Sequence, residues 1–566
     1  MSKSRASDKK IGLSKEDKAF QLNKITYLEF KHLEPERTLL YLFPRLKFDG
    51  NLGKIRNSSM IMTIEKFQEF FLDDELKQHF QNFSAYPDIV YKWLETDLLD
   101  LINRGHPVKE AVVAPRPLHG NAYKYRNAKQ ARDYDSSKQL YWMLFYARQG
   151  LGQKARDDLR NYIFAGLDAN TDKLDFTNSV TRSQIDVETQ AILHLDNQAD
   201  VAAKSESSKP ADRFEPLCIG QADLLAEDIL RLLTYEKHMP RSVLIDYLKT
   251  LFSFHLGLYH LRLLKLLPAL VKRQGNDPTC QRCPMAPSQK APHGDCAYRI
   301  GLLVDMGDSG NIAMAELARR STEIHYQRIT PYLHAHFTVV KINEMADYLS
   351  HLGKLPADIV TSSVGELLQL TQKGYEKQRD SFFETRLQQL IERFLYDPED
   401  VAIPQEIQDI LDLKLDSMES YIEILMSQRS QYHRQQLIKC LDSLLQKNNS
   451  SGLLQQPNRG PRRFVLGSRL LEVLLQLAVL EHQGSRFSTR EIRIDELLEF
   501  LRERYGLYID RLPPIDGFGE ATIQDQQALR ANLETFKTRL REIGFFQDLS
   551  DAYITQTVTP RYTINS

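Results

Sequence analysis

A Pro-rich loop with three cysteines constrains this chain more than any other feature of its sequence. Four of the five cysteines, Cys218, Cys280, Cys283 and Cys296, fall within one 79-residue stretch, and the last three share the loop CQRCPMAPSQKAPHGDC. The C-x2-C spacing lets two thiolates chelate one ion, and His293 lies three places before the third cysteine of the loop. A tetrahedral site needs four ligands, so one of these five residues is spare. The loop is therefore predicted to bind a metal.

Zinc is the favoured metal because no feature of the sequence requires redox chemistry. A structural site of four thiolates, or of three thiolates and one imidazole, would fix the loop between helices. An iron-sulfur cluster is the alternative, because Cys283 is followed directly by Pro284 and the fourth cysteine is distant. A disulfide is the competing interpretation, but the rest of the sequence is typical of intracellular proteins, whose thiols stay reduced. Cys218 is the expected fourth ligand, since that explains why four of five cysteines share one segment.

Length and charge limit the remaining function classes. The chain has 566 residues, enough for three or four domains, and no apolar segment near its start resembles a signal peptide. No run of about 18 uncharged apolar residues occurs, so we expect a cytoplasmic protein without a membrane partner. The net charge of −1 gives no overall nucleic-acid signal, and any such contact must come from local patches.

Two polar stretches predict the domain boundaries of a mainly α, multi-domain protein. Residues 197–212 and 446–463 lack the apolar periodicity of their neighbours and are typical of linkers. They separate an N-terminal helical domain, 1–196, from a helical middle domain, 213–445, that carries the cysteine loop. The last block, 464–566, is expected to be compact.

The order of elements in the last block predicts a winged helix-turn-helix. Helices are expected over 466–481, 494–505 and 526–543, because apolar residues recur there at helical spacing. Two β-like runs follow, 552–558 and 561–564, which would pair as the hairpin of the wing.

The third of these helices is the predicted recognition helix. Its apolar residues recur at spacings of 4, 3, 4 and 3, which places on one buried stripe Leu529, Leu533, Phe536, Leu540 and Ile543. Gly544 is expected to end the helix in a left-handed conformation. Its exposed face presents Arg530, Lys537 and Arg541, which could meet a DNA backbone. The alternative is a module that only docks proteins.

A second candidate nucleic-acid surface lies between residues 116 and 134. Its basic residues precede the first acidic one: Arg116, Lys124, Arg126, Lys129 and Arg132. Tyr123 and Tyr125 are interleaved with them, and cations with stacking rings are the two ingredients of strand binding. A solvated basic loop is the alternative interpretation.

Catalytic motifs are sparse. Asp305 and Asp308 follow a short predicted strand, where carboxylates can hold Mg²⁺, but Asp308 also suits an ordinary turn. The chain contains no phosphate loop of the Walker type, no G-x-S-x-G elbow and no G-x-G-x-x-G fingerprint. These absences favour a non-catalytic protein, with a metal-dependent nuclease as the alternative.

The helical body, the winged-helix-like tail and the loop with Cys280, Cys283, Pro284 and Cys296 together resemble a known group of proteins. These are the non-catalytic accessory subunits of bacterial phage-defence operons, of the phosphorothioation-dependent restriction and methylation-associated defence kinds. The resemblance implies a DNA-engaging or scaffolding subunit, whose partner ATPases or nucleases do the chemistry. A free-standing winged-helix transcription regulator is the alternative, and it should be a stable dimer that reads spaced half-sites.

Overall fold

The computed structural model is mainly helical, as the sequence predicts, with only short strands in the described residues. The structure describes residues 13–55, 63–72, 82–106, 109–127, 129–165, 186–198, 203–204, 213–277, 280, 283, 296–307, 311–355, 360–395, 403–483, 486–546 and 557–564. No helix within these ranges is both long and apolar enough to cross a lipid bilayer.

The N-terminal part combines short helices with small strand pairs. Its helices are α1 (Pro35–Lys47), α2 (Ile64–Leu72), α3 (Pro87–Trp93), α4 (Ser136–Tyr146), α5 (Leu151–Ile163) and α7 (Val187–Gln198), with tighter or wider turns η2 (Phe83–Ala85), η3 (Leu94–Leu98) and η4 (Gly120–Tyr125). Its strands are β1 (Lys54–Ile55), β2 (Leu99–Ile102), β3 (Ala111–Pro115) and β4 (Ala203–Lys204). They pair antiparallel, β1 with β4 and β2 with β3.

The middle part contains the longest helices. They are α8 (Ile219–Leu233), α9 (Arg241–Lys272), α11 (Ile312–Gln327), α12 (Ile329–His351), α13 (Val364–Leu368), η5 (Gln369–Thr371), α14 (Glu376–Leu395), α15 (Gln405–Asp412) and α16 (Ser417–Leu444). A single short strand, β5 (Leu302–Leu303), lies between α9 and α11.

The C-terminal part alternates short strands with helices. Its elements are β6 (Leu454–Gln455), β7 (Arg463–Phe464), α17 (Ser468–Ala478), β8 (Leu480–Gln483), β9 (Arg486–Thr489), β10 (Ile492–Arg493), α18 (Ile494–Tyr505), β11 (Leu507–Tyr508), α19 (Ile523–Glu542) and β12 (Thr557–Val558). β6 pairs with β7 and β8 with β9, both antiparallel. Residues 446–463, predicted from composition as a linker, therefore contain strand β6 and the first residue of β7.

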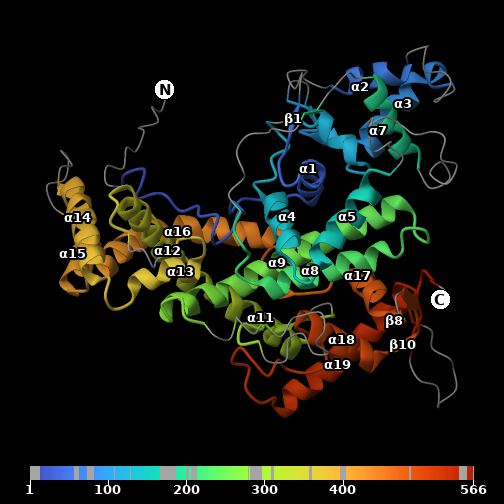
Figure 1. Ribbon diagram of the computed structural model, residues 1–566. Coiled ribbons are helices and arrows are strands. Elements are labelled where there is room, and N and C mark those ends of the chain that lie inside the picture. The colour runs from blue at the N-terminus through green and yellow to red at the C-terminus, as the bar shows by residue number, and fades with distance from the viewer. Residues whose placement is uncertain are drawn as a thin grey trace, which may run out of the picture.

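Helix α9 is the central element of the fold. Its apolar residues lie on all sides rather than on one stripe, and most of its side chains are buried, which is typical of a helix surrounded by protein. It contacts α8, α12, α16, α17 and α1. Figure 1 shows α9 in the middle of the molecule, with the N-terminal helices on one side, α17 to α19 on another, and α14 to α16 extending away.

A parallel strand pair joins the C-terminal part to the middle part. Leu302 pairs with Leu507 and Leu303 with Tyr508, although these strands are distant in the sequence. Asn532 of α19 is buried beside this pair, where its side-chain amide donates to the carbonyl oxygens of Val304 (2.9 Å) and Ile509 (2.8 Å). Buried backbone groups need such partners, so this amide fixes α19 against the strands.

The predicted stripe of α19 is confirmed. Leu529, Phe536 and Leu540 are buried and the other two members are partly buried. Thr522 and Asp525 form a capping box at its start, and Gly544 follows its end with φ +76°.

The strands of the predicted wing pair differently from the expectation. Val558 of β12 pairs with Ile492 of β10, and the backbone NH of Thr489 donates to the carbonyl of Ile564 (3.1 Å). In the part of the chain that the structure describes, the two runs therefore contact β9 and β10 instead of each other. Residues 552–556 lie outside the described ranges.

Buried neutral histidines are a shared feature of the helical core. Burial lowers the pKa of each, to about 4 for His260, His325 and His433 and to about 3 for His336. His336 on α12 is representative: its ring hydrogen-bonds the carbonyl of Phe20 (2.7 Å) and the hydroxyl of Tyr332 (3.1 Å). Each ring fills a site that favours the uncharged form.

These histidines predict a loss of stability in mild acid. Between pH 6.5 and 4 an unfolded histidine binds a proton that the folded one does not, so the free energy of unfolding falls as the pH falls. At pH 5 we expect a loss of roughly 1–2 kcal/mol for each such histidine. His336→Gln should flatten the pH dependence of the thermal unfolding midpoint. The wild-type chain is the reference, and a His336→Gln profile equal to the wild-type profile would contradict this account.

Candidate metal centre and buried polar junctions

The four clustered cysteines occupy the start of α8 and the connection between α9 and β5. Cys218 is the residue that precedes α8 and is buried, whereas Cys280, Cys283 and Cys296 are half-buried and pack against the main core. All four are free thiols.

Polar contacts hold the two ends of the cysteine loop together. The Tyr298 hydroxyl donates to the buried carboxylate of Asp277, and Arg273 forms an ion pair with the same carboxylate at 3.2 Å. Asp277 stands three residues before Cys280, and Tyr298 stands two residues after Cys296. Because residues span at most about 3.5 Å each, these contacts bring the first and last thiols of the loop into one region.

The thiols also lie within electrostatic range of one another. Burial raises the pKa of Cys280, and the neighbouring Cys218, Asp277, Cys296 and Cys283 raise this pKa further through charge repulsion. Across the described residues, no three or more His, Cys, Asp or Glu side chains are already arranged to hold an ion. His293, the alternative ligand, lies outside the described residues.

Two arginines contact the sulfur atoms. Arg148, in the turn between α4 and α5, hydrogen-bonds Cys283 and also pairs with the carboxylate of Asp223 at 2.6 Å. Arg262 of α9 is only 1% exposed and hydrogen-bonds Cys218. Burial raises the pKa of the Cys218 thiol, and Arg262 opposes that rise because a cation favours the thiolate.

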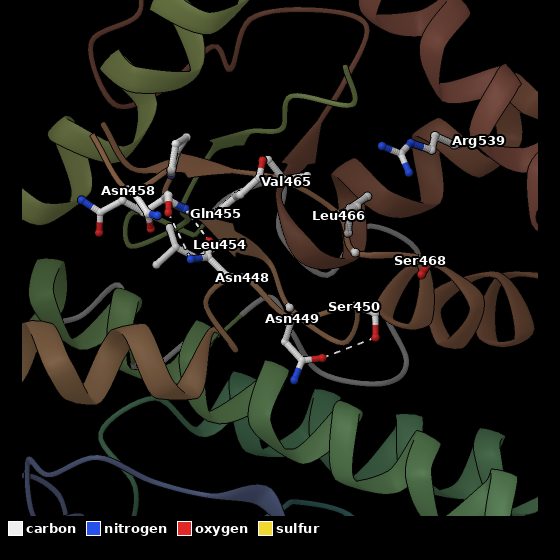
Figure 2. A pocket seen from close by; sticks show the side chains of 14 residues that line it. Asn448, Asn449, Ser450, Leu454, Gln455, Asn458, Val465, Leu466, Ser468 and Arg539 are labelled. Carbon is white, nitrogen blue, oxygen red and sulfur yellow. Dashed lines mark hydrogen bonds between the residues drawn. The ribbon is translucent and has the colours of Figure 1, made fainter. Parts of the chain in front are cut away.

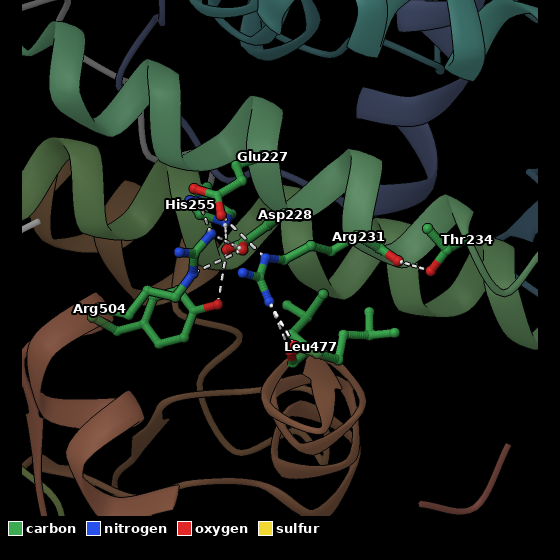
Figure 3. A network of polar contacts seen from close by, with 9 residues as sticks. Glu227, Asp228, Arg231, Thr234, His255, Leu477 and Arg504 are labelled. Carbon is green, nitrogen blue, oxygen red and sulfur yellow. Dashed lines mark hydrogen bonds and ion pairs between the residues drawn. The ribbon is translucent and has the colours of Figure 1, made fainter. Parts of the chain in front are cut away.

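A second group of polar residues lies deep between α8, α9 and α18, and Figure 3 shows it. The carboxylate of Asp228 accepts hydrogen bonds from Arg504 (3.0 and 2.5 Å), from the Tyr505 hydroxyl (2.8 Å) and from His255 (3.0 Å). Gln221 donates to the other nitrogen of the histidine ring at 2.8 Å, so the neutral ring carries its proton on Nε2 and donates it to the carboxylate. We call these five residues the Asp228 junction.

The charges within the Asp228 junction are balanced internally. Burial alone would raise the pKa of Asp228, but Arg504 and His255 outweigh burial and bring it to about 2. Burial lowers the pKa of His255 despite the adjacent carboxylate. The carboxylate is therefore ionised and the imidazole neutral at pH 7, with Arg504 as the counter-ion.

Neighbouring contacts extend this attachment. Arg231 of α8 pairs with Glu227 at 3.1 Å and donates to the carbonyls of Leu477 (3.3 Å) and Leu480 (3.2 Å), which belong to α17 and β8 (Figure 3). In the Asp228 junction, Tyr505 contacts Asp228 although the two residues are 277 positions apart in the sequence. The sequence does not predict this group, because no local pattern indicates it.

Asp305, the carboxylate proposed for a nuclease, is part of another structural contact. It is buried, forms an ion pair with Arg463 of β7 at 2.9 Å and accepts the backbone NH of Gly307 (2.9 Å). Asp308 lies outside the described residues. A carboxylate neutralised in this way serves the fold, since Mg²⁺ would have to displace its arginine.

The candidate DNA-binding residues of α19 differ in their surroundings. Arg530 and Arg541 are exposed, whereas Lys537 is 15% exposed and pairs with Glu534 at 2.7 Å. The guanidinium of Arg541 lies 5.0 Å from the ring centre of Phe546. Two of the three predicted cations are thus presented to solvent.

The second candidate surface lacks the stacking rings that the sequence suggested. Tyr123 and Tyr125 are buried, at 0% and 2% exposure, and cannot stack on a base. Arg126 lies over the ring of Tyr41 at 4.7 Å and is partly buried. Among its other cations, Arg116 and Lys129 are exposed and Lys124 is half-buried. The interleaved tyrosines belong to the core because η4 turns them inward beneath α1.

A polar pocket of about 520 Å³ lies between the β6–β7 hairpin and the start of α17 (Figure 2). Its lining residues include Asn448, Asn449, Ser450 and Arg539. Asn448 holds the hairpin by exchanging hydrogen bonds with the backbone of Gln456, at 2.7 and 3.0 Å. Its amide therefore shapes the pocket wall.

The fold and these sites define a mainly helical protein whose conspicuous buried carboxylates are engaged in holding the fold. More narrowly, residues 15–562 match the family model of the methylation-associated defense system protein MAD7, and the chain belongs to this family. No curated protein and no solved structure matches the chain.

The Asp228 junction predicts that a single substitution at its central carboxylate lowers the stability of the fold strongly. Asp228→Asn should lower the free energy of unfolding by about 2–4 kcal/mol, because the buried guanidinium of Arg504 loses the charge of its nearest carboxylate and keeps only Glu227, at 3.2 Å, as a counter-ion. Asp246→Asn, at a half-exposed ion pair on α9, should cost less than about 1 kcal/mol. Denaturant unfolding measures both changes, and similar losses for the two variants would show that the junction is not a main anchor.

Proposed function

We propose that this protein is a non-catalytic, DNA-engaging scaffold of a methylation-associated defence complex. The match over residues 15–562 to a defence-system family is the observation that carries the proposal. In this role, DNA and other proteins of the operon, such as an ATPase or a nuclease, are its partners.

The use of the buried carboxylates supports a scaffolding role. Asp228, Asp305 and Asp516 each neutralise arginine or lysine side chains from other segments of the chain. Asp516, for example, pairs with Arg328 at 2.6 Å and Lys265 at 3.0 Å. Such contacts hold the C-terminal part in a fixed position. A scaffold needs this rigidity, because it must hold its partner molecules in a defined arrangement.

The exposed cations of α19 support contact with DNA. Arg530 and Arg541 are exposed on one flank of α19, each next in sequence to a residue of the buried stripe that attaches the helix to the body. No described carboxylate forms an ion pair with Arg530. In a winged-helix arrangement this face of α19 would meet the duplex, and phosphate contacts would supply most of the affinity.

The DNA proposal predicts a salt-dependent interaction that depends on α19. The Arg530→Ala/Arg541→Ala double variant should bind a duplex more weakly at low salt, and the slope of log affinity against log salt should fall by about 2. A gel-shift or anisotropy titration at several salt concentrations measures this.

The matched control is the Arg493→Ala/Arg511→Ala double variant. It removes two exposed arginines of the C-terminal part that lie outside α19, and it should retain the wild-type slope. Absence of any duplex shift at low salt, or equal slopes for both variants, would reject DNA contact by α19. A stable dimer that selects spaced half-sites would instead identify a transcription regulator.

A further inference from the structure

We propose that Cys218, Cys280, Cys283 and Cys296 bind one zinc ion as four thiolates, in a structural site that fastens the start of α8 to the connection between α9 and β5. This site goes beyond the proposed function, because neither DNA contact nor partner binding requires it. Cys218 and Cys280 are 62 positions apart in sequence, and polar contacts around them bring their two segments close to each other.

Contacts on both sides of the sulfur atoms bring these segments together. The Asp277–Tyr298 hydrogen bond closes the loop that carries Cys280, Cys283 and Cys296. Arg148 then connects this loop to α8, because it contacts Cys283 and forms an ion pair with Asp223 of α8. Cys218 precedes the same helix by a single residue. The fold thus gathers four thiols without any disulfide among them.

The charge of the surroundings suits a tetrathiolate site. Four thiolates around Zn²⁺ carry a net charge of −2, and a buried charge of this size requires compensation. Arg262 and Arg148 donate hydrogen bonds to the sulfur atoms of Cys218 and Cys283, and each supplies one positive charge. Sulfur ligands that accept such hydrogen bonds are characteristic of the surroundings of metal sites. Because Arg148 also pairs with Asp223, the two guanidinium groups would offset part of the charge that the ion and its ligands leave.

Metal binding would bring the four thiols into tetrahedral coordination, which they do not have in this structure. Since no described set of side chains already has coordinating geometry, the sulfur atoms would move onto the ion as their protons leave. Zn²⁺ and four thiols would give the tetrathiolate and up to four protons released to solvent, with no change of oxidation state. The closed site would then fix the segment that leads through Tyr298 to β5.

Metal analysis of the purified full-length protein tests the proposal. We expect one zinc per chain, a colourless protein, and after exchange with Co²⁺ a visible spectrum of tetrahedral cobalt with thiolate ligands. Cys218→Ser should lose the stoichiometric zinc, whereas His293→Ala should keep it. The control variant Cys440→Ala removes the remaining cysteine, which lies in α16 outside the cluster, and should also keep one zinc.

Several results would overturn the proposal. Protein that is prepared without chelator and binds neither Zn²⁺ nor Co²⁺ has no such site. A brown protein that contains iron and sulfide would hold an iron-sulfur cluster instead of zinc. Loss of zinc from His293→Ala but not from Cys218→Ser would show that His293, and not Cys218, is the fourth ligand.

A measurement on the wild-type chain covers the case in which Cys218→Ser fails to fold. The four cluster thiols should resist alkylation until a chelator removes the zinc, and mass spectrometry counts the modified residues. Unchanged alkylation of Cys280, Cys283 and Cys296 with and without chelator would reject the site. Duplex binding is measured separately, so failure of the zinc site and failure of the DNA proposal are distinguishable.

Discussion

A buried guanidinium needs a counter-ion, and the ion pair of Arg504 with Asp228 meets this need at the position where the C-terminal part joins the helical body. The carboxylate belongs to α8 and the arginine to α18, so neither segment can leave the other without exposing or isolating a charge. His255 and Tyr505 saturate the remaining oxygen. Directional contacts of this kind determine one relative placement of the helices, which apolar packing alone would leave less sharply defined.

The polar contacts described above share a structural role. Asp516 and Asn532 join α9, β5 and α19 much as Asp228 joins α8 and α18. These contacts join segments that are distant in the sequence, and they hold the C-terminal part against the middle part.

Local patterns predicted the parts of the fold that depend on neighbouring residues. The stripe of α19 and the left-handed Gly544 follow from spacings of three and four residues, and both are present. The grouping of the four cysteines around one ion stays a prediction, and the structure places them at the start of α8 and in the connection between α9 and β5.

Features set by distant contacts were not predictable in this way. Tyr123 and Tyr125 have the sequence surroundings of an exposed basic loop, yet the turn that contains them packs against α1. Residues 446–463 have the polar composition of a linker, but they form most of a hairpin. Backbone and side-chain amide groups hold this hairpin, so it gives no apolar pattern in the sequence. Nothing near Asp228 in sequence indicates Arg504, because their pairing exists only once the helices have assembled.

The parallel pairing of β5 with β11 also governs when this protein can finish folding. Roughly 200 residues separate the two strands, and a ribosome adds about 5–20 residues each second, so β5 waits on the order of 10–40 s for its partner. During that time β5 and the apolar residues that α19 will cover lack their partners. A chain that ends before residue 507 never gains the strand that pairs with β5.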